Sequence, residues 1–307
     1  MTGKESSHEL FFLDYLMLLV KTRICEFAII NNRGAHNMED LRLVANNMRK
    51  NIVKMVHNAK SGHPGGSLSC ADILTALYFN VMNIDKNNLN DKKRDKLVMS
   101  KGHASPALYA VLAEKGFISE EELMTFRLID SRIQGHPNMK SCPGVDMTTG
   151  SLGQGLSVGV GMALANKLDN NPFRTYVICG DGECDEGMIW EAAMAASHYK
   201  LDNLLMILDH NGLQIDGRNE DVMNNAPLGE KFAAFGWNVF GVDGHDIDAV
   251  TEACKAAETV KGKPTVIIAE TIKGKGVSFM ENQAGWHGKA PNDEELAIAL
   301  RDLGGEQ

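Results

Sequence analysis

Two oxygen-bearing side chains follow two apolar segments of the sequence. Gly180-Asp181-Gly182 comes directly after the apolar run 175–179, and 28 residues separate it from Asn211, which follows the apolar run 204–208. Carboxylate and amide oxygens suit a hard divalent cation, which also takes phosphate oxygens and water. The glycines let the backbone approach an anion. A Gly-Asp-Gly turn alone is also typical of an ordinary strand end, but with the spaced asparagine it predicts a metal–diphosphate clamp.

Four histidines stand beside glycine or another small residue. Histidine suits proton transfer and hydrogen bonding to sugar hydroxyls near neutral pH. A single histidine is more often structural, but four in glycine-flanked segments favour a polar catalytic site. The sequence has no His-x-x-x-His pair, so zinc hydrolysis is not favoured. The segments are Ser61-Gly62-His63-Pro64-Gly65-Gly66, Lys101-Gly102-His103-Ala104, Gly135-His136-Pro137 and Trp286-His287-Gly288.

A third motif is rich in glycine and precedes small residues at helical spacing. It reads Thr149-Gly150-Ser151-Leu152-Gly153-Gln154-Gly155 and is followed by Gly159, Gly161, Ala163 and Ala165. One interpretation is a close contact between helices through small residues. The other is a loop laid against a ligand, with a helix packed tightly behind it. The two interpretations are compatible.

The remaining pattern predicts an α/β fold, a doubly wound and mostly parallel sheet with helices on both faces. We expect strands at 97–99, 175–179, 204–208, 237–242 and 265–269, because short apolar runs alternate with helical segments. Ligands of such sheets bind at the carboxyl ends of the strands. Helices are expected at 38–58, 70–80, 104–113, 190–198 and 246–259, and a solvated loop at 85–96.

Composition excludes several classes of protein. The 307 residues are 44% hydrophobic and 23% charged, which is ordinary for a globular protein. A formal net charge of −9 argues against a nucleic-acid partner, because such binding depends on basic side chains. It does not exclude a phosphorylated small substrate. The six cysteines form no C-x-x-C pair, which makes zinc improbable and favours reduced thiols in a cytoplasmic protein.

The first 37 residues are set apart from the rest. The segment 10–20 is apolar except for Asp14, and Lys21, Arg23 and Glu26 follow it, so we expect neither a membrane span nor a signal peptide. Two interpretations of residues 1–37 stay open: an amphipathic helix docked on the body or a partner, and an extension added by an early start codon. We expect one domain at 38–307.

Taken together and in this order, the motifs resemble the N-terminal half of transketolases. These enzymes use thiamine diphosphate to move two-carbon ketol units between sugars. The resemblance extends over residues 38–291. It rests on the Ser61–Gly66 segment, the Gly102-His103 turn, the glycine loop 150–155 and the Gly-Asp-Gly…Asn pair.

The resemblance implies a role for each matching residue. Asp181, Asn211 and the main-chain carbonyl of Leu213 would bind Mg²⁺ or Ca²⁺, which bridges the cofactor diphosphate. The histidines would surround the donor carbonyl and its hydroxyls, as the catalytic set His63, His103, His136 and His287. Glu186 and Glu191 match acidic positions at the subunit contact, although a solvated first helical turn explains them equally well. The implied cofactor contacts are His103, Gly150, Ser151, Leu152, Gly180, Asp181, Gly182, Glu183, Asn211, Ile215 and His287.

The resemblance also implies a partner. A full transketolase chain continues into a second α/β domain, which supplies a glutamate that activates the cofactor, and into a third domain. This chain ends at Gln307, shortly after Trp286-His287-Gly288. It therefore resembles the first subunit of a split transketolase, in a heterotetramer with its partner or a homodimer of these domains. Sugar phosphates are the implied substrates. Ser151 stands where single-chain relatives commonly have proline.

Two other function classes stay open. The same cofactor domain occurs in deoxyxylulose-phosphate synthases and in 2-oxo acid decarboxylases and dehydrogenases. The histidine set favours sugars over 2-oxo acids. The other alternative is a non-catalytic homologue that binds cofactor or partner. The complete set of metal positions and histidines argues against it.

Overall fold

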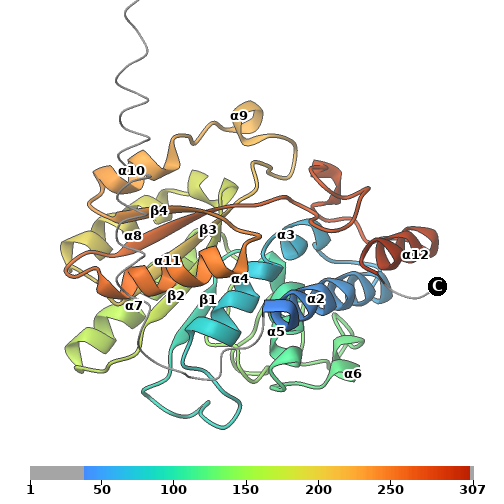
Figure 1. The fold of residues 1–307 in the computed structure, drawn as a ribbon, viewed down its shortest axis with the longest axis horizontal. Helices are drawn as coiled ribbons and strands as arrows, with labels where there is room; N and C mark the ends of the chain where they lie inside the picture. The colour runs from blue at the N-terminus through green and yellow to red at the C-terminus, as the bar shows by residue number, and fades with distance from the viewer. Residues whose placement is uncertain (1–37, 305–307) are drawn as a thin grey trace, which may run out of the picture. The chain divides into compact units, whose positions relative to one another are not determined.

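The computed structural model describes residues 38–304. The predicted extension at 1–37 lies outside the described residues. The core of the described part is a sheet of five parallel strands in the order β1-β2-β3-β5-β4 (Figure 1). The five predicted strands are confirmed, with their bounds within two residues of the prediction. The strands are β1 (Lys96–Met99), β2 (Thr175–Gly180), β3 (Leu204–His210), β4 (Asn238–Asp243) and β5 (Thr265–Glu270).

Alternate residues of each strand enter two separate hydrophobic cores. In β2, Tyr176 and Ile178 pack on one face of the sheet, and Val177 and Cys179 pack on the other. Both faces are buried, which explains why the strands are continuous apolar runs. The predicted doubly wound α/β fold is therefore confirmed.

Helices cover both faces of the sheet. One core contains α2 (Met38–Asn58), α4 (Ala71–Ala76), α5 (Ser105–Glu114) and α11 (Ile247–Thr259). The opposite core contains α7 (Gln154–Leu168), α8 (Gly187–His198) and α10 (Leu228–Ala234). The remaining described helices are α3 (Pro64–Ser69), α6 (Glu120–Leu123), α9 (Asn219–Val222) and α12 (Asp293–Asp302), with a π-helical turn at Leu77–Val81 and 3₁₀ turns at Gly102–Ala104, Gly182–Asp185 and Ala284–Trp286.

The helix predicted at 70–80 is different in the structure. Two short helices, α3 and α4, replace it, and the chain bends between them at Cys70 (φ −98°, ψ 11°). Helix α3 begins at Pro64, whose fixed φ suits the first turn of a helix. Gly65 and Gly66 are poor helix formers, so the sequence pattern misses this helix. All six of its residues are buried, which indicates that packing stabilises it.

The predicted amphipathic helix at 38–58 is confirmed with the same bounds. Met48 and Ile52 are fully buried, whereas Leu43 is exposed on the opposite side. None of the helices described between residues 38 and 304 is long and apolar enough to cross a membrane.

Candidate active site

The predicted site residues meet where the parallel strands end. His103 lies in the turn after β1, Asp181 directly follows β2, and Asn211 directly follows β3. Because β1, β2 and β3 are neighbours in the sheet, their carboxyl ends bring these three residues to one edge. Lys273, three residues after β5, reaches the same edge, since its Nζ lies 3.3 Å from the carbonyl oxygen of Leu213.

The Asp181 carboxylate is buried without a counter-ion. Its side chain accepts hydrogen bonds from the backbone N–H groups of Gly182 (2.8 Å) and Gly212 (2.5 Å). Residues 38–304 provide no ion-pair partner for it. Burial and the neighbouring Asp209 raise the pKa of Asp181. A buried carboxylate with no cation is unfavourable, so the site fits a bound metal ion.

The other two predicted metal ligands lie beside Asp181. Gly212, which donates to Asp181, stands between Asn211 and Leu213 in the chain. The Asn211 amide oxygen accepts from the Leu213 N–H at 3.2 Å, and its amide nitrogen is 3.3 Å from Asp209. The structure thus brings together a carboxylate, an amide and a backbone carbonyl, a donor set that suits Mg²⁺ or Ca²⁺.

Three of the predicted histidines contact one another. The ring centroids are 5.4 Å apart for His63 and His103, 5.2 Å for His63 and His287, and 5.1 Å for His103 and His287. Burial and neighbouring positive charges lower the pKa of His63 and of His287 to about 4. They lower the pKa of His103 well below its usual range. All three rings are therefore neutral at pH 7 and are able to donate and accept hydrogen bonds.

The fourth histidine, His136, lies at the border of this cluster. It faces Gly150, where a side chain's Cβ would lie 3.1 Å from the imidazole ring. Burial and the charge of Arg127 lower the pKa of His136. Arg127 in turn donates to the Ser61 hydroxyl at 3.0 Å, beside His63. His136 therefore joins the glycine loop to the histidine cluster.

The glycine loop packs directly against the His103 turn. A Cβ on Gly102 would lie 2.8 Å from the backbone nitrogen of Gly150, and a Cβ on Gly155 would lie 2.3 Å from Ser100 Oγ. Gly150 has φ +152°, a conformation that favours glycine. The close packing inferred from the sequence is confirmed. The contact of Gly150, Ser151 and Leu152 with a ligand stays a prediction.

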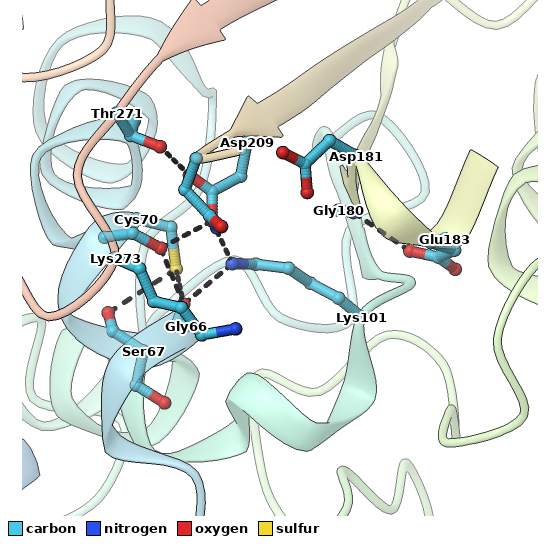
Figure 2. Close-up of polar contacts among 12 residues, drawn as sticks. Gly66, Ser67, Cys70, Lys101, Gly180, Asp181, Glu183, Asp209, Thr271 and Lys273 are labelled. Carbon is cyan, nitrogen blue, oxygen red and sulfur yellow. Dashed lines mark hydrogen bonds and ion pairs between the residues drawn. The ribbon is translucent and has the colours of Figure 1, made fainter. Parts of the chain in front are cut away.

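Glu183 holds three of the motifs together. Its buried carboxylate accepts from Ser100 Oγ (2.5 Å), the Gly153 N–H (2.8 Å) and the Gly180 N–H (3.1 Å). Figure 2 shows Glu183 on the far side of Gly180 from the ion pair of Lys101 and Asp209. Since protein donors surround its oxygens, the geometry favours a bracing role over the predicted direct contact with a cofactor.

Three other predicted positions are on the surface near the site. Ile215, predicted to contact the cofactor, is 62% exposed in the loop after β3. Glu186 and Glu191 are exposed at the start and on the surface of α8. Their roles at a subunit contact stay predictions.

The sequence analysis missed Lys273. This lysine is buried, and its Nζ lies 3.2 Å from His287 Nδ1 and 3.3 Å from the Leu213 carbonyl oxygen. Burial lowers its pKa to about 8. A cation at this position suits a diphosphate. The available signal was Lys273-Gly274-Lys275-Gly276, which follows an apolar strand as the Gly-Asp-Gly motif does.

Comparison with protein families agrees with this geometry. Residues 41–307 match the domain family described as transketolase, thiamine diphosphate binding domain. One of the two subunits of apulose-4-phosphate transketolase from Phocaeicola vulgatus is 46% identical over 266 residues, which cover 87% of this chain and 94% of that protein. The 6-deoxy-6-sulfo-D-fructose transketolase subunit SqwG of Clostridium sp. strain MSTE9 is also 46% identical, over 86% of this chain and 96% of that protein.

Solved structures give the same result. Transketolase from Campylobacter jejuni superposes with a TM-score of 0.83 at 35% identity, over 88% of this chain and 44% of that chain. Transketolase from Leishmania mexicana gives 0.81 at 33% identity, over 87% and 41%. This chain spans about two fifths of the length of those enzymes. With its parallel sheet, its clustered histidines and the match over residues 41–307, the chain belongs to the transketolase family and carries that family's thiamine diphosphate binding domain.

Proposed function

We propose that the chain is the diphosphate-binding subunit of a two-chain transketolase, which transfers a two-carbon ketol unit from a ketose or ketose phosphate to an aldose or aldose phosphate. The observation that carries the proposal is the buried, unpaired Asp181 carboxylate. It lies beside Asn211 and Leu213, at the edge of the sheet that also holds the cluster of neutral histidines.

In this proposal, Asp181, Asn211 and the Leu213 carbonyl hold Mg²⁺ or Ca²⁺. Lys273 adds a positive charge next to the same carbonyl. Together they would neutralise the diphosphate of thiamine diphosphate and fix one end of the cofactor. The bound cofactor supplies the carbanion and the electron sink for breaking the carbon–carbon bond.

The histidines then act on the substrate. Nδ1 of His63 is buried and has no hydrogen-bond partner within residues 38–304. Such a group is normally satisfied, so it fits a hydroxyl or carbonyl oxygen of a bound sugar. Because His63, His103 and His287 are neutral at pH 7, they are able to take up protons from substrate hydroxyls. His136 adds a donor at the edge of the site.

A partner chain completes this site. The two relatives at 46% identity are both named as subunits of transketolases. We expect the partner to carry the pyrimidine-binding and C-terminal domains, including the activating glutamate. The assembly would be a heterotetramer, or would contain a homodimer of this domain, in the cytoplasm. The acidic net charge of −9 supports small-molecule substrates over nucleic acid.

The test is reconstitution. The chain is copurified with its partner from the native source and assayed for ketol transfer with thiamine diphosphate and Mg²⁺. Activity only in the mixture supports the proposal. Products formed from 2-oxo acids or from glyceraldehyde phosphate and pyruvate would identify the other cofactor-dependent classes. Cofactor binding with no turnover beside the copurified chain would indicate a non-catalytic homologue.

A further inference from the structure

We propose that Asp209 is a positioning residue of the metal site, whose carboxylate holds the Asn211 side-chain amide so that the amide oxygen is left for the cation. This inference rests on the proposed function, since it takes Asn211 as a metal ligand. Asp209 itself is not in the predicted ligand set. It is the penultimate residue of β3, two positions before Asn211.

Asp209 is fully buried among donors. Its carboxylate accepts from the hydroxyls of Ser69 and Thr271, each at 2.5 Å, and forms an ion pair with Lys101. The fourth donor is the Asn211 amide nitrogen at 3.3 Å. Figure 2 shows Lys101 extended toward Asp209, with Thr271 on the other side. This carboxylate therefore has its contacts inside the protein and does not depend on a ligand.

The charge of Asp209 dictates which way the amide faces. Burial alone would raise its pKa, but Lys101 and the hydroxyl donors outweigh burial and lower it. An ionised carboxylate only accepts hydrogen bonds. It therefore faces the NH₂ group of Asn211 and turns the amide oxygen away. The Leu213 N–H, 3.2 Å from that oxygen, agrees with the same orientation.

Without Asp209, the two ends of the amide would be nearly equivalent to their surroundings. A reversed amide would present NH₂ to the cation, and a group that only donates hydrogen bonds is no metal ligand. Residues that orient metal ligands in this way typically contribute 10- to 100-fold to metal affinity or activity.

Lys101 makes a second carboxylate acceptable at this position. Asp209 already raises the pKa of Asp181, so an unbalanced charge there would disfavour ionised Asp181. The Lys101 ammonium neutralises Asp209 and also donates to the Gly66 carbonyl at 2.7 Å. Because Lys101 precedes His103 and Gly66 follows His63, the same cluster links the metal ligands to the histidine loops.

The test compares Asp209→Asn with a matched control, Asp146→Asn. Asp146 is an equally buried carboxylate that pairs with Arg94 at 2.5 Å and accepts from the Leu97 N–H, at the opposite end of β1 from His103. We expect Asp209→Asn to weaken Mg²⁺-dependent thiamine diphosphate binding by about 10- to 100-fold in calorimetric titrations. Asp146→Asn should lower the melting temperature and leave that affinity unchanged. The inference is overturned if Asp209→Asn binds like wild type, or if both variants lose affinity equally.

A swap separates orientation from general damage. Asn211→Asp alone places two carboxylates in contact and should bind Mg²⁺ more weakly than wild type. The double variant Asp209→Asn with Asn211→Asp restores one amide facing one carboxylate and keeps the net charge. We expect it to bind at least about 10-fold more tightly than Asp209→Asn. If Asp209→Asn does not fold, the double variant is compared with wild type. In that case a loss below 10-fold supports the inference, and a larger loss overturns it. A double variant no tighter than Asp209→Asn also overturns it.

The wild-type titration distinguishes the two levels of the argument. If wild-type chain binds thiamine diphosphate without any dependence on Mg²⁺, the proposed metal site fails. If wild type depends on Mg²⁺ and the Asp209 variants do not differ from it, only the positioning role fails.

Discussion

At the scale of single residues, Asp181 stands out because the surrounding protein does not balance its charge. It is 2% exposed, and both of its hydrogen bonds come from neutral backbone groups. By contrast, Asp209 and Asp146, which are also buried, each have a cationic partner. The difference indicates that a cation from outside the chain completes the environment of Asp181.

Asp181→Ala should therefore abolish Mg²⁺-dependent thiamine diphosphate binding. The substitution removes the only charged metal ligand, and the Asn211 and Leu213 oxygens alone bind a hard cation weakly. Isothermal titration of cofactor with and without Mg²⁺ measures the effect. Asp216→Ala, an exposed carboxylate in the neighbouring loop, is the control and should bind like wild type. Unchanged affinity in Asp181→Ala would contradict the metal site.

His63→Ala should lower turnover more than it lowers cofactor affinity. Its unpartnered Nδ1 is available to substrate, and general acid–base groups typically contribute 10²- to 10⁴-fold. We expect a loss of kcat of roughly 100-fold or more in the reconstituted enzyme, with the cofactor titration nearly unchanged. His198→Ala, at the end of α8, is the control. Wild-type turnover in His63→Ala would remove this histidine from the mechanism.

At the scale of elements, the site depends on loops that approach one another too closely for side chains. The His103 turn and the 150–155 loop meet at Gly102 and Gly150, and α7 meets Ser100 at Gly155. Glu183 connects the same segments through hydrogen bonds. The loops therefore move as one unit, and a change in any one of them displaces the others.

Gly102→Ala should weaken both folding and cofactor binding. Its Cβ would lie 2.8 Å from the Gly150 nitrogen and from the Thr149 hydroxyl, so the two loops must separate. We expect a loss of about 1–3 kcal/mol in the free energy of unfolding, measured by urea denaturation, with weaker thiamine diphosphate binding. Gly161→Ala is the matched control, because its Cβ meets nothing within 4 Å and helix α7 should gain up to about 1 kcal/mol. Equal stability of the two variants would contradict the packing argument.

The elements also show what the sequence was able to predict. The strands were predicted closely because both sides of each strand are buried, which makes the apolar run continuous. The metal ligands and histidines were predicted because their spacing resembles a known family. Helix α3 was missed because packing, rather than propensity, stabilises Pro64–Ser69. Lys273 was missed because its importance comes from burial next to Leu213, which is distant in sequence. The brace formed by Glu183 is likewise visible only from its three partners.

At the scale of the whole molecule, the histidine cluster makes stability depend on pH. His63 and His287 have pKa values of about 4 in the folded chain, below the value of about 6.5 expected in the unfolded chain. Between those values the unfolded state binds more protons. The stabilisation from the neutral rings is therefore fully present above pH 6.5 and is lost as the pH falls toward 4.

His63→Asn should reduce this dependence on pH. Urea denaturation between pH 7.5 and 4.5 gives the free energy of unfolding, and removing one depressed histidine should reduce its slope by up to one proton, about 1.4 kcal/mol per pH unit. His198→Asn serves as the comparison, since its ring is remote from the cluster. Identical slopes for wild type and His63→Asn would contradict the depressed pKa.

The contact between His63 and His287 has a consequence for biosynthesis. Their rings are 5.2 Å apart, although they lie near opposite ends of the described chain. Contacts of such long range form slowly and late, because a large loop must close first. A nascent chain that has not yet docked β5 lacks both Lys273 and His287 at the site. The cofactor would therefore stabilise only finished molecules, so its supply in the cell would govern how many completed chains survive degradation.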